Sequence, residues 1–207
     1  MMMTKEEFVA LQEKNEERIA QIRKSAYALH DSVNQKYAAT LPYGYHLDMV
    51  ANAVREYGHL VCAEEKDMLA MIFGAYFHDS IEDARQTYND VVKIARTLID
   101  EEQVIMAAEI VYALTNDKGR SRAERAGEKY YRGIRETPYA PFVKLCDRYA
   151  NISYSCVGHD KLNLRMRGVY QEELPHFLEA INAHSDDIRF SVPQELIDNL
   201  FNCLKAD

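Results

Sequence analysis

Side chains that are suitable ligands for a divalent metal ion stand at three separate points of the sequence. His46 follows a Pro-Gly turn, His78 and Asp79 are neighbours, and Asp147 lies much further along the chain. Imidazole and carboxylate groups bind Mn²⁺, Fe²⁺ or Zn²⁺ well, and this set includes no thiolate. Neighbouring residues point about 100° apart on an ideal helix. His78 and Asp79 can therefore reach one ion only where a helix ends, or if the ion sits between their two directions.

Two further acidic residues follow this pair within about one helical turn. Glu82 and Asp83 lie three and four residues after Asp79, which places them on one side if the turn continues. A metal lowers the pKa of bound water toward neutrality, and a nearby carboxylate can orient that water or carry its proton. A solvated acidic turn is the alternative interpretation of both residues. Together with the metal ligands, they indicate metal-assisted hydrolysis.

Basic side chains are concentrated in one segment of an acidic chain. Residues 118–135 hold seven Lys and Arg residues and two Glu residues, and a solvated helix face explains most of them. Such a concentration beside a metal site would nevertheless attract a phosphorylated substrate. The residues that we expect to contact the anion are Lys118, Arg122, Lys144 and Arg148. Arg148 has an alternative role, which is to pair with a structural carboxylate.

The most hydrophobic segment of the chain predicts the element that carries the His-Asp pair. Residues 68–77 are apolar on every face, which indicates a buried central helix with His78 at its end. Residues 5–39 contain neither Gly nor Pro and predict one long helix or two in series. Pro42 and Gly44 then break the pattern. No segment predicts a convincing strand.

Apolar spacing and helix-boundary signals predict helices in the remaining segments. Thr87 and Asp90 resemble a capping box, Pro138 ends a basic helix, and Pro193 suits the first position of the last helix. Pro175 is expected to interrupt or open another helix. The expected helices lie near residues 47–61, 88–99, 104–114, 120–136 and 140–155. We therefore predict an all-α fold in one domain, with a helical bundle around the central buried helix.

Composition restricts the class of partner. The chain has 207 residues and a formal net charge of −8, which opposes a general attraction to nucleic-acid phosphates or anionic membranes. A small-molecule partner is therefore favoured over a nucleic-acid polymer or a membrane. The four cysteines show no CxxC spacing and are too sparse for a disulfide scaffold, so we expect reduced thiols and a cytoplasmic protein. We find neither a signal-peptide pattern nor a run of about 18 apolar residues.

The same residues carry a resemblance to a known family. In order, His46, His78-Asp79 and Asp147 resemble the H...HD...D signature of the HD phosphohydrolase superfamily, whose fold is a helical bundle around a divalent metal. More narrowly, four segments resemble successive motifs of RelA/SpoT-type alarmone hydrolases, which read approximately PYxxH, LHDxxED, LTxxK and VKLADRxxNM. The matching segments are PYGYH (42–46), FHDSIED (77–83), LTNDK (114–118) and VKLCDRYANI (143–152). Four linked motifs over about residues 25–155 are more specific than an HD pair alone.

The resemblance implies a role for each of these residues. A Mn²⁺ ion would be bound by His46, His78, Asp79 and Asp147, with Fe²⁺, Zn²⁺ or Mg²⁺ as other candidates. Glu82 and Asp83 would assist the attacking water, and Asn151 would contact the substrate. In the family, the reaction removes the 3′-pyrophosphate from guanosine tetra- or pentaphosphate. The resemblance also implies a single HD-type domain over residues 1–207, with a C-terminal helical extension at about 156–207.

Two other functions are compatible with the same residues. A 5′-nucleotidase or other nucleotide phosphatase of the HD group would release orthophosphate from a monophosphate. A non-catalytic module that senses nucleotides would keep the fold without turnover, although such a module would not need Glu82 and Asp83. The sequence therefore predicts first a metal-dependent phosphohydrolase that acts on a small phosphorylated nucleotide.

Overall fold

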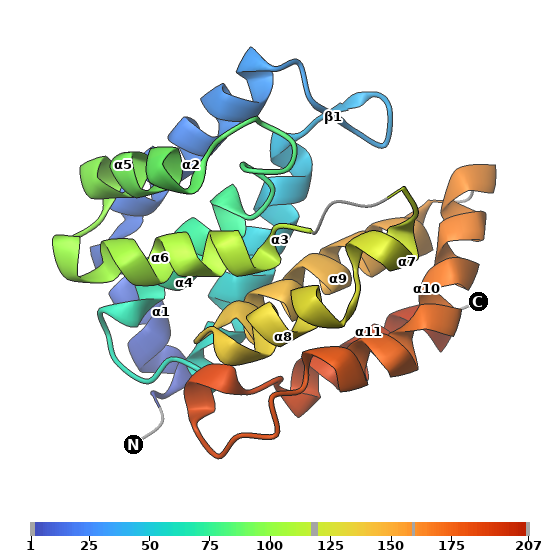
Figure 1. Ribbon diagram of the computed structural model, residues 1–207. Coiled ribbons are helices and arrows are strands. Elements are labelled where there is room, and N and C mark those ends of the chain that lie inside the picture. Colours follow the sequence, from blue (N-terminus) through green and yellow to red (C-terminus); the bar gives the residue numbers. More distant parts are fainter. Residues whose placement is uncertain (1–2, 117–119, 159, 206–207) are drawn as a thin grey trace.

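The chain folds into helices joined by short connections (Figure 1). The computed structural model describes residues 3–116, 120–158 and 160–205, with the backbone alone for residues 122 and 123. The helices are α1 (Lys5–Lys14), α2 (Glu16–Ser32), α3 (Gly44–Tyr57), α4 (Asp67–Phe77), α5 (Tyr88–Leu98), α6 (Glu101–Leu114), α7 (Arg122–Arg125), α8 (Glu128–Glu136), α9 (Ala140–Val157), α10 (Lys161–Ile181) and α11 (Gln194–Lys205). Two 3₁₀ helices, η1 (Gly58–Leu60) and η2 (Ile188–Phe190), and two short strands, β1 (Lys36–Tyr37) and β2 (Leu41–Pro42), complete the described elements. The fold is all-α, as predicted. Among the described residues, no helix combines the length and the apolar character needed to cross a membrane.

Helix α4 lies at the centre of the bundle. All of its residues are buried, and it packs against α2, α3, α6 and α9. Phe73 and Phe77 stack with their ring centroids 4.3 Å apart, and burial of each such side chain stabilises the fold by about 1.5–3 kcal/mol. The prediction of a buried central helix is confirmed.

The residues predicted to bind a metal lie in α3, directly after α4, and in α9. Gly44 opens α3, so His46 lies in the first turn of that helix. Gly44 allows a close approach to α2, because a Cβ atom there would lie 2.4 Å from the Tyr27 ring. His78 directly follows α4, and Asp147 lies within α9. Because α3, α4 and α9 contact one another, residues far apart in the sequence come together.

The segment before α3 differs from its prediction. Residues 5–39 do form two helices in series, but α2 ends at Ser32 and a β-hairpin follows, in which β1 pairs antiparallel with β2. Ala38 and Ala39 in the connecting turn have φ angles of 47° and 68°, a region that favours residues such as Gly and Asn. The expectation of no strand is wrong here because alanine carries no turn signal.

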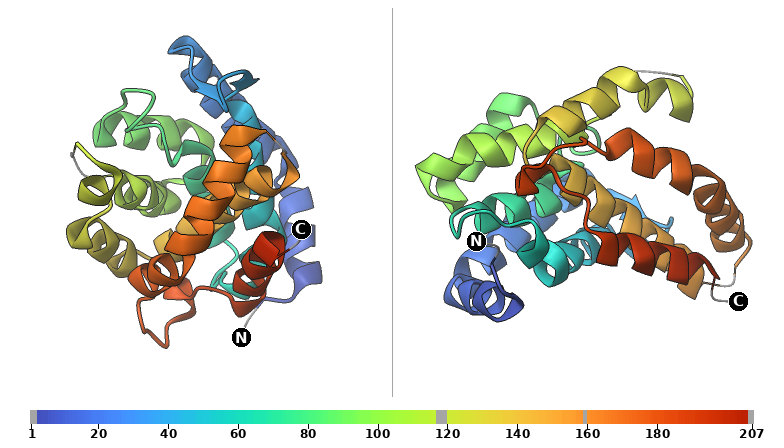
Figure 2. Two further views of the ribbon diagram at one scale, coloured as in Figure 1. Left: turned by 90° about the vertical axis from the view of Figure 1, so that its right-hand side faces the viewer. Right: turned by 90° about the horizontal axis from the view of Figure 1, so that it is seen from below.

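The later helices follow the prediction with two changes. The capping box of Thr87 and Asp90 is present and opens α5. The basic helix expected at 120–136 is divided into α7 and α8, because the backbone is extended at Gly127. Pro175 neither interrupts nor opens a helix, since α10 continues through it. Both α10 and α11 contact α9, and Figure 2 shows the C-terminal helices from two further sides.

Gly74 marks a close approach between α4 and α6 and gives a test of this packing. A Cβ atom at Gly74 would lie 2.6 Å from Cγ2 of Ile110. We expect Gly74→Ala to lower the free energy of unfolding by about 1–3 kcal/mol, because overpacking outweighs the helix propensity of alanine. Urea unfolding measures the change. The matched control is Gly168→Ala in α10, where the added methyl group meets open space and should raise stability by up to about 1 kcal/mol. A stabilised Gly74→Ala protein would contradict this description of the core.

Candidate metal centre

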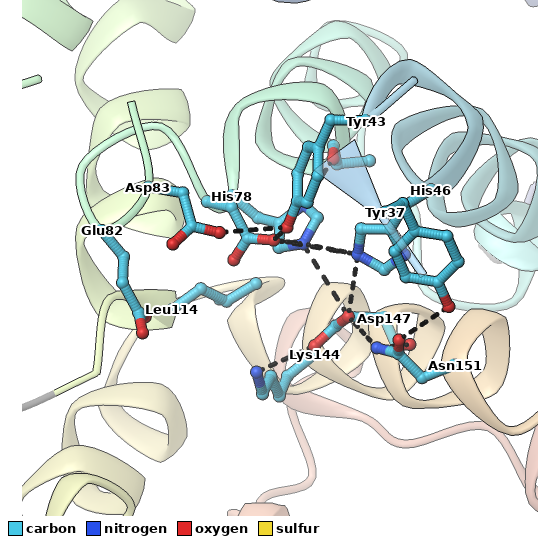
Figure 3. A network of polar contacts seen from close by, with 12 residues as sticks. Tyr37, Tyr43, His46, His78, Glu82, Asp83, Leu114, Lys144, Asp147 and Asn151 are labelled. Atoms are coloured by element: carbon cyan, nitrogen blue, oxygen red, sulfur yellow. Dashed lines mark hydrogen bonds and ion pairs between the residues drawn. The ribbon is translucent and has the colours of Figure 1, made fainter. Parts of the chain in front are cut away.

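Potential ligand atoms from α3, from the segment after α4 and from α9 lie close together, and Figure 3 shows His46, His78 and Asp147 among them. Nε2 of His46 and Nε2 of His78 are 3.2 Å apart. Oδ2 of Asp79 lies 2.9 Å from the His78 nitrogen and 3.8 Å from the His46 nitrogen. Oδ1 of Asp147 lies 3.4 Å from the His46 nitrogen and 3.8 Å from the His78 nitrogen. Donor atoms about 2.1 Å from a shared ion stand roughly 3–3.5 Å apart. The ligand atoms of His46, His78 and Asp79 all lie within 4.8 Å of one another, so these three side chains could hold a divalent ion, and Asp147 lies beside both histidines.

The backbone after α4 allows two adjacent residues to face one point. His78 retains helical angles, with φ −54° and ψ −34°, and the N–H of Asp83 donates to the carbonyl of Asp79 at 2.8 Å. Nδ1 of His78 lies 2.8 Å from the carbonyl oxygen of Ala75. A carbonyl can only accept, so Nδ1 carries a proton, and in the neutral form of His78 the lone pair of Nε2 points at the cluster. His78 is therefore held in the tautomer that a metal ligand requires.

Asp147 is a buried carboxylate that its own helix keeps ionised. Nζ of Lys144 lies 2.9 Å from Oδ2, and Nδ2 of Asn151 donates to Oδ1 at 2.7 Å. Burial alone would raise the pKa of Asp147, but the charge of Lys144 and the hydrogen bond with His46 hold that pKa well below its usual range. A carboxylate must be deprotonated to bind a metal, so α9 presents Asp147 in the required form.

Tyr43 connects the ligand Asp79 to Asp83. The Tyr43 hydroxyl donates to Oδ2 of Asp79 and lies 3.2 Å from Oδ2 of Asp83. Nε2 of Gln35 also donates to this Asp83 oxygen, at 3.2 Å. A hydroxyl has a single proton, so Tyr43 can donate to only one of the two carboxylates. Burial and the charges of Asp79 and Glu82 raise the pKa of Asp83 to about 6, and Asp83 can therefore exchange a proton near neutral pH.

Glu82 is held by the segments that follow α6. Nδ2 of Asn116 donates to Oε2 of Glu82 at 2.8 Å, and Nη1 of Arg125 lies 3.8 Å from Oε1. Glu82 and Asp83 line a cavity of about 300 Å³ that His46, Asp79 and Asp147 also line. The two acidic residues therefore face the same space as three of the four predicted metal ligands. Asn116 and Arg125 could not be identified from the sequence as partners of Glu82, because both contacts depend on how α6 and α7 pack.

The residues predicted to contact substrate have different surroundings. Lys144, Arg148 and Asn151 line the same cavity. Arg148 pairs with Glu173 at 2.9 Å and lies over the Phe177 ring at 4.3 Å. This is the structural role that the sequence left open as an alternative. Lys118 and the side chain of Arg122 lie outside the described residues.

Asn151 has its polar atoms directed at the protein. Nδ2 donates to both Oδ1 and the backbone oxygen of Asp147, at 2.7 and 3.0 Å. Oδ1 accepts a hydrogen bond from the Tyr37 hydroxyl at 3.1 Å. In this arrangement, Asn151 orients the carboxylate of Asp147. A direct contact between Asn151 and a substrate would require one of these hydrogen bonds to be exchanged.

His30 is a residue of the site that the sequence analysis did not identify. Its ring stacks on Tyr43, with centroids 4.6 Å apart and planes at 19°. The side chain is buried, and neither ring nitrogen has a hydrogen-bond partner among the described residues. Burial lowers the pKa of His30 to about 4. A signal was present, since His30 continues the buried stripe of α2, where Ile22 and Ala26 precede it at helical spacing.

Comparison with known proteins does not change this description. No model of a known protein family matches the chain, and no curated protein matches it. The geometry of the cavity therefore remains the basis for assigning a function.

We expect Mn²⁺ to stabilise the protein through the four ligands. At about 100 times the Kd, binding adds roughly 2.7 kcal/mol to the free energy of unfolding, which raises Tm by about 5–10 °C for a chain of this length. His46→Gln removes one ligand atom and should abolish most of the shift, as measured by a thermal melt with and without metal. The control is Asp100→Asn, whose carboxylate pairs with Arg18 at 2.7 Å on the surface, and it should retain the full shift. An equal shift in His46→Gln would show that the ion binds elsewhere.

His30 should make the metal-free protein sensitive to acid. Its pKa in the folded protein, about 4, lies below the ordinary value of 6.5, so the unfolded chain binds more protons between these pH values. Stability should therefore fall as the pH drops through this window, by roughly 2–3 kcal/mol. His30→Leu should remove this component and leave stability at pH 7 unchanged or higher, because an unpaired polar group is no longer buried.

Chemical unfolding at a series of pH values measures this difference between wild type and variant. His176→Gln, at an exposed position of α10, is the control and should follow the wild-type curve. A His30→Leu curve that runs parallel to the wild type between pH 4 and 6.5 would show that His30 contributes nothing to acid sensitivity.

Proposed function

We propose that the protein is a metal-dependent phosphohydrolase that acts on a small phosphorylated nucleotide, and that it is similar to the RelA/SpoT-type small alarmone hydrolases. The reaction would remove the 3′-pyrophosphate from guanosine tetra- or pentaphosphate. The observation that supports this most strongly is the group of His46, His78 and Asp79, with Asp147 beside both histidines, next to a cavity that two further carboxylates, Glu82 and Asp83, also line. A nucleotide-sensing module would need the ligands but would have no use for the additional acids.

The ligand set suits a divalent cation of the first transition series. A bound ion would polarise the scissile phosphate and lower the pKa of a water molecule at the site. The donors are two imidazoles and two carboxylates, which favour Mn²⁺, Fe²⁺ or Zn²⁺ and allow Mg²⁺. Mn²⁺ is our first choice because the resembled family uses it.

Asp83 is the group best suited to receive a proton from the attacking water. With a pKa of about 6, it is mostly ionised at pH 7 and remains basic enough to accept a proton. Tyr43 and Gln35 fix the position of its Oδ2 atom. Glu82, held by Asn116, would orient the water from the same side of the cavity, since the two acidic residues lie next to each other in Figure 3.

Cations around the cavity would balance the charge of a phosphate group. Arg125, Lys144 and Arg148 all line it. Lys144 and Arg148 already pair with carboxylates, so they act as fixed positive charges. Fixed charges of this kind stabilise developing negative charge without having to reorganise during the reaction. A volume of about 300 Å³ is enough for a pyrophosphate group with surrounding water.

The first experiment is to purify the protein without added metal, identify the ion that remains bound and screen phosphorylated nucleotides. Release of pyrophosphate from the 3′ position would support the proposed reaction. Release of orthophosphate from nucleoside monophosphates would instead support a 5′-nucleotidase. Thermal stabilisation by nucleotide and Mn²⁺ without turnover would support a sensing module.

Substitutions should separate metal binding from catalysis. We expect Glu82→Gln to retain the ion and to lose turnover by about 100-fold or more, because a carboxylate that acts on water is removed. Asp147→Ala should lose both the ion and the activity. Metal content by mass spectrometry and steady-state kinetics measure the two effects. Glu109→Gln is the matched control, since Glu109 accepts a hydrogen bond from Tyr88 at 2.6 Å and does not line the cavity. Undiminished hydrolysis by Asp147→Ala would exclude the assigned catalytic site.

A further inference from the structure

A second, smaller cavity lies next to the metal cavity and shares a wall with it. Its volume is about 140 Å³, and its lining includes the apolar side chains of Leu162 and Met166. Three residues line both cavities, namely Tyr37, Asn151 and Tyr170. We call this smaller space the α9–α10 hollow, because most of its lining comes from these two helices. Nothing in the proposed reaction uses it.

Tyr37 forms the part of the shared wall that reaches the metal ligands. Its ring is stacked on the His46 ring, with centroids 4.9 Å apart and planes at 15°. The Tyr154 ring also contacts it, with centroids 4.9 Å apart and planes at 66°, and of the two cavities Tyr154 lines only the α9–α10 hollow. The Tyr37 hydroxyl donates to Oδ1 of Asn151 at 3.1 Å, as Figure 3 shows. The ring is therefore fixed between an aromatic side chain of the hollow and a metal ligand.

The backbone around Tyr37 comes from the hairpin and not from the bundle. Tyr37 is the last residue of β1, and Ala38 and Ala39 follow it with positive φ angles. These angles fix the direction in which the hairpin turns back toward α3. Asn151 belongs to the α9 helix and is engaged by Asp147. Tyr37 is thus the shared residue that can be truncated without substituting a residue of a bundle helix or a direct partner of Asp147.

We infer that Tyr37 determines specificity by closing the α9–α10 hollow to substrate, an inference that depends on the proposed function. A substrate whose phosphate lies at the metal ligands cannot place its base or another flat group in the hollow while the Tyr37 ring stands between the two spaces. The nucleoside part of the substrate must then extend from the metal ligands toward the side of the metal cavity that lies away from the α9–α10 hollow. On that side the metal cavity shares Ala126, Tyr131 and Arg148 with a larger groove of about 940 Å³ beside α8 and α10.

The test compares two ligands that differ only by a nucleoside, inorganic pyrophosphate and guanosine diphosphate. Calorimetry in the presence of Mn²⁺ gives the ratio of the two Kd values. A substitution that changes only the binding of the phosphate groups alters both Kd values by the same factor, so this effect cancels in the ratio. Tyr37→Ala joins the hollow to the metal cavity and should shift the ratio in favour of the nucleotide by about tenfold, through burial of additional apolar surface. Tyr37→Phe keeps the ring and should leave the ratio within about twofold of wild type.

A second substitution distinguishes the opened hollow from a general disturbance. Met166→Phe in the Tyr37→Ala background fills the hollow from α10, and the ratio should return toward the wild-type value. An unchanged ratio in Tyr37→Ala would overturn the inference. A ratio that shifts against the nucleotide would also overturn it, because Tyr37 would then be a stacking platform for the base.

A measurement that needs neither metal nor phosphate keeps this inference separate from the proposed function. Indole, a flat apolar probe, is titrated into metal-free protein while the imidazole signals of His46 are followed by NMR. In Tyr37→Ala the probe can reach the His46 ring from the hollow and should shift these signals, whereas in wild type it should not. Equal shifts in both proteins would show that the Tyr37 ring does not separate the hollow from the metal cavity. This result would refute the inference even if pyrophosphate and nucleotide fail to bind and the proposed function is wrong.

Discussion

The negative charge of Asp147 is the constraint on which the site depends. A buried carboxylate is costly by several kcal/mol unless it is paired and hydrogen-bonded. Helix α9 meets this requirement from within, since Lys144 precedes Asp147 by three residues and Asn151 follows by four, and both contact its oxygens. The carboxylate can therefore stand beside two buried imidazoles before any ion binds. The site is prepared by local helical spacing, and the bundle has only to bring α3 and the end of α4 against it.

The other ligands are also held in place by neighbouring groups, and these neighbours come from different segments of the chain. His78 is held by the carbonyl of Ala75 within α4, while Asp79 accepts a hydrogen bond from Tyr43 at the base of the hairpin. Tyr43 in turn is covered by His30 of α2. Partners of this kind orient metal ligands and raise their affinity for the ion. A change in the hairpin or in α2 would consequently reach the ligands without touching them.

The sequence predicted the helices and the candidate ligands because each depends on local information. Hydrophobic periodicity identified α4, and residue types identified His46, His78-Asp79 and Asp147. In the structure, a carboxylate oxygen of each aspartate lies within 3.8 Å of both histidine Nε2 atoms. The features that the sequence did not predict were decided by long-range contacts or by backbone angles without a local signal. Arg148 could be placed on α9 from spacing, but its partners Glu173 and Phe177 in α10 could not. The hairpin after α2 was missed because alanine adopts positive φ there without any sequence signal for a turn.

The C-terminal extension contributes to the shape of the cavity and does more than cover the bundle. Tyr170, Glu173 and Phe177 recur at helical spacing along α10, so they share one face of that helix. Tyr170 lines both the metal cavity and the α9–α10 hollow. Glu173 and Phe177 hold Arg148, which directly follows Asp147 in α9. An arginine that is both paired and stacked keeps a defined orientation, so its charge stays at the rim of the metal cavity.

Without α10, Arg148 would lose both contacts and the two cavities would lose a common wall. The motif-bearing core at about 25–155 is therefore not the whole of the site, because one wall of its cavity is built from residues beyond it.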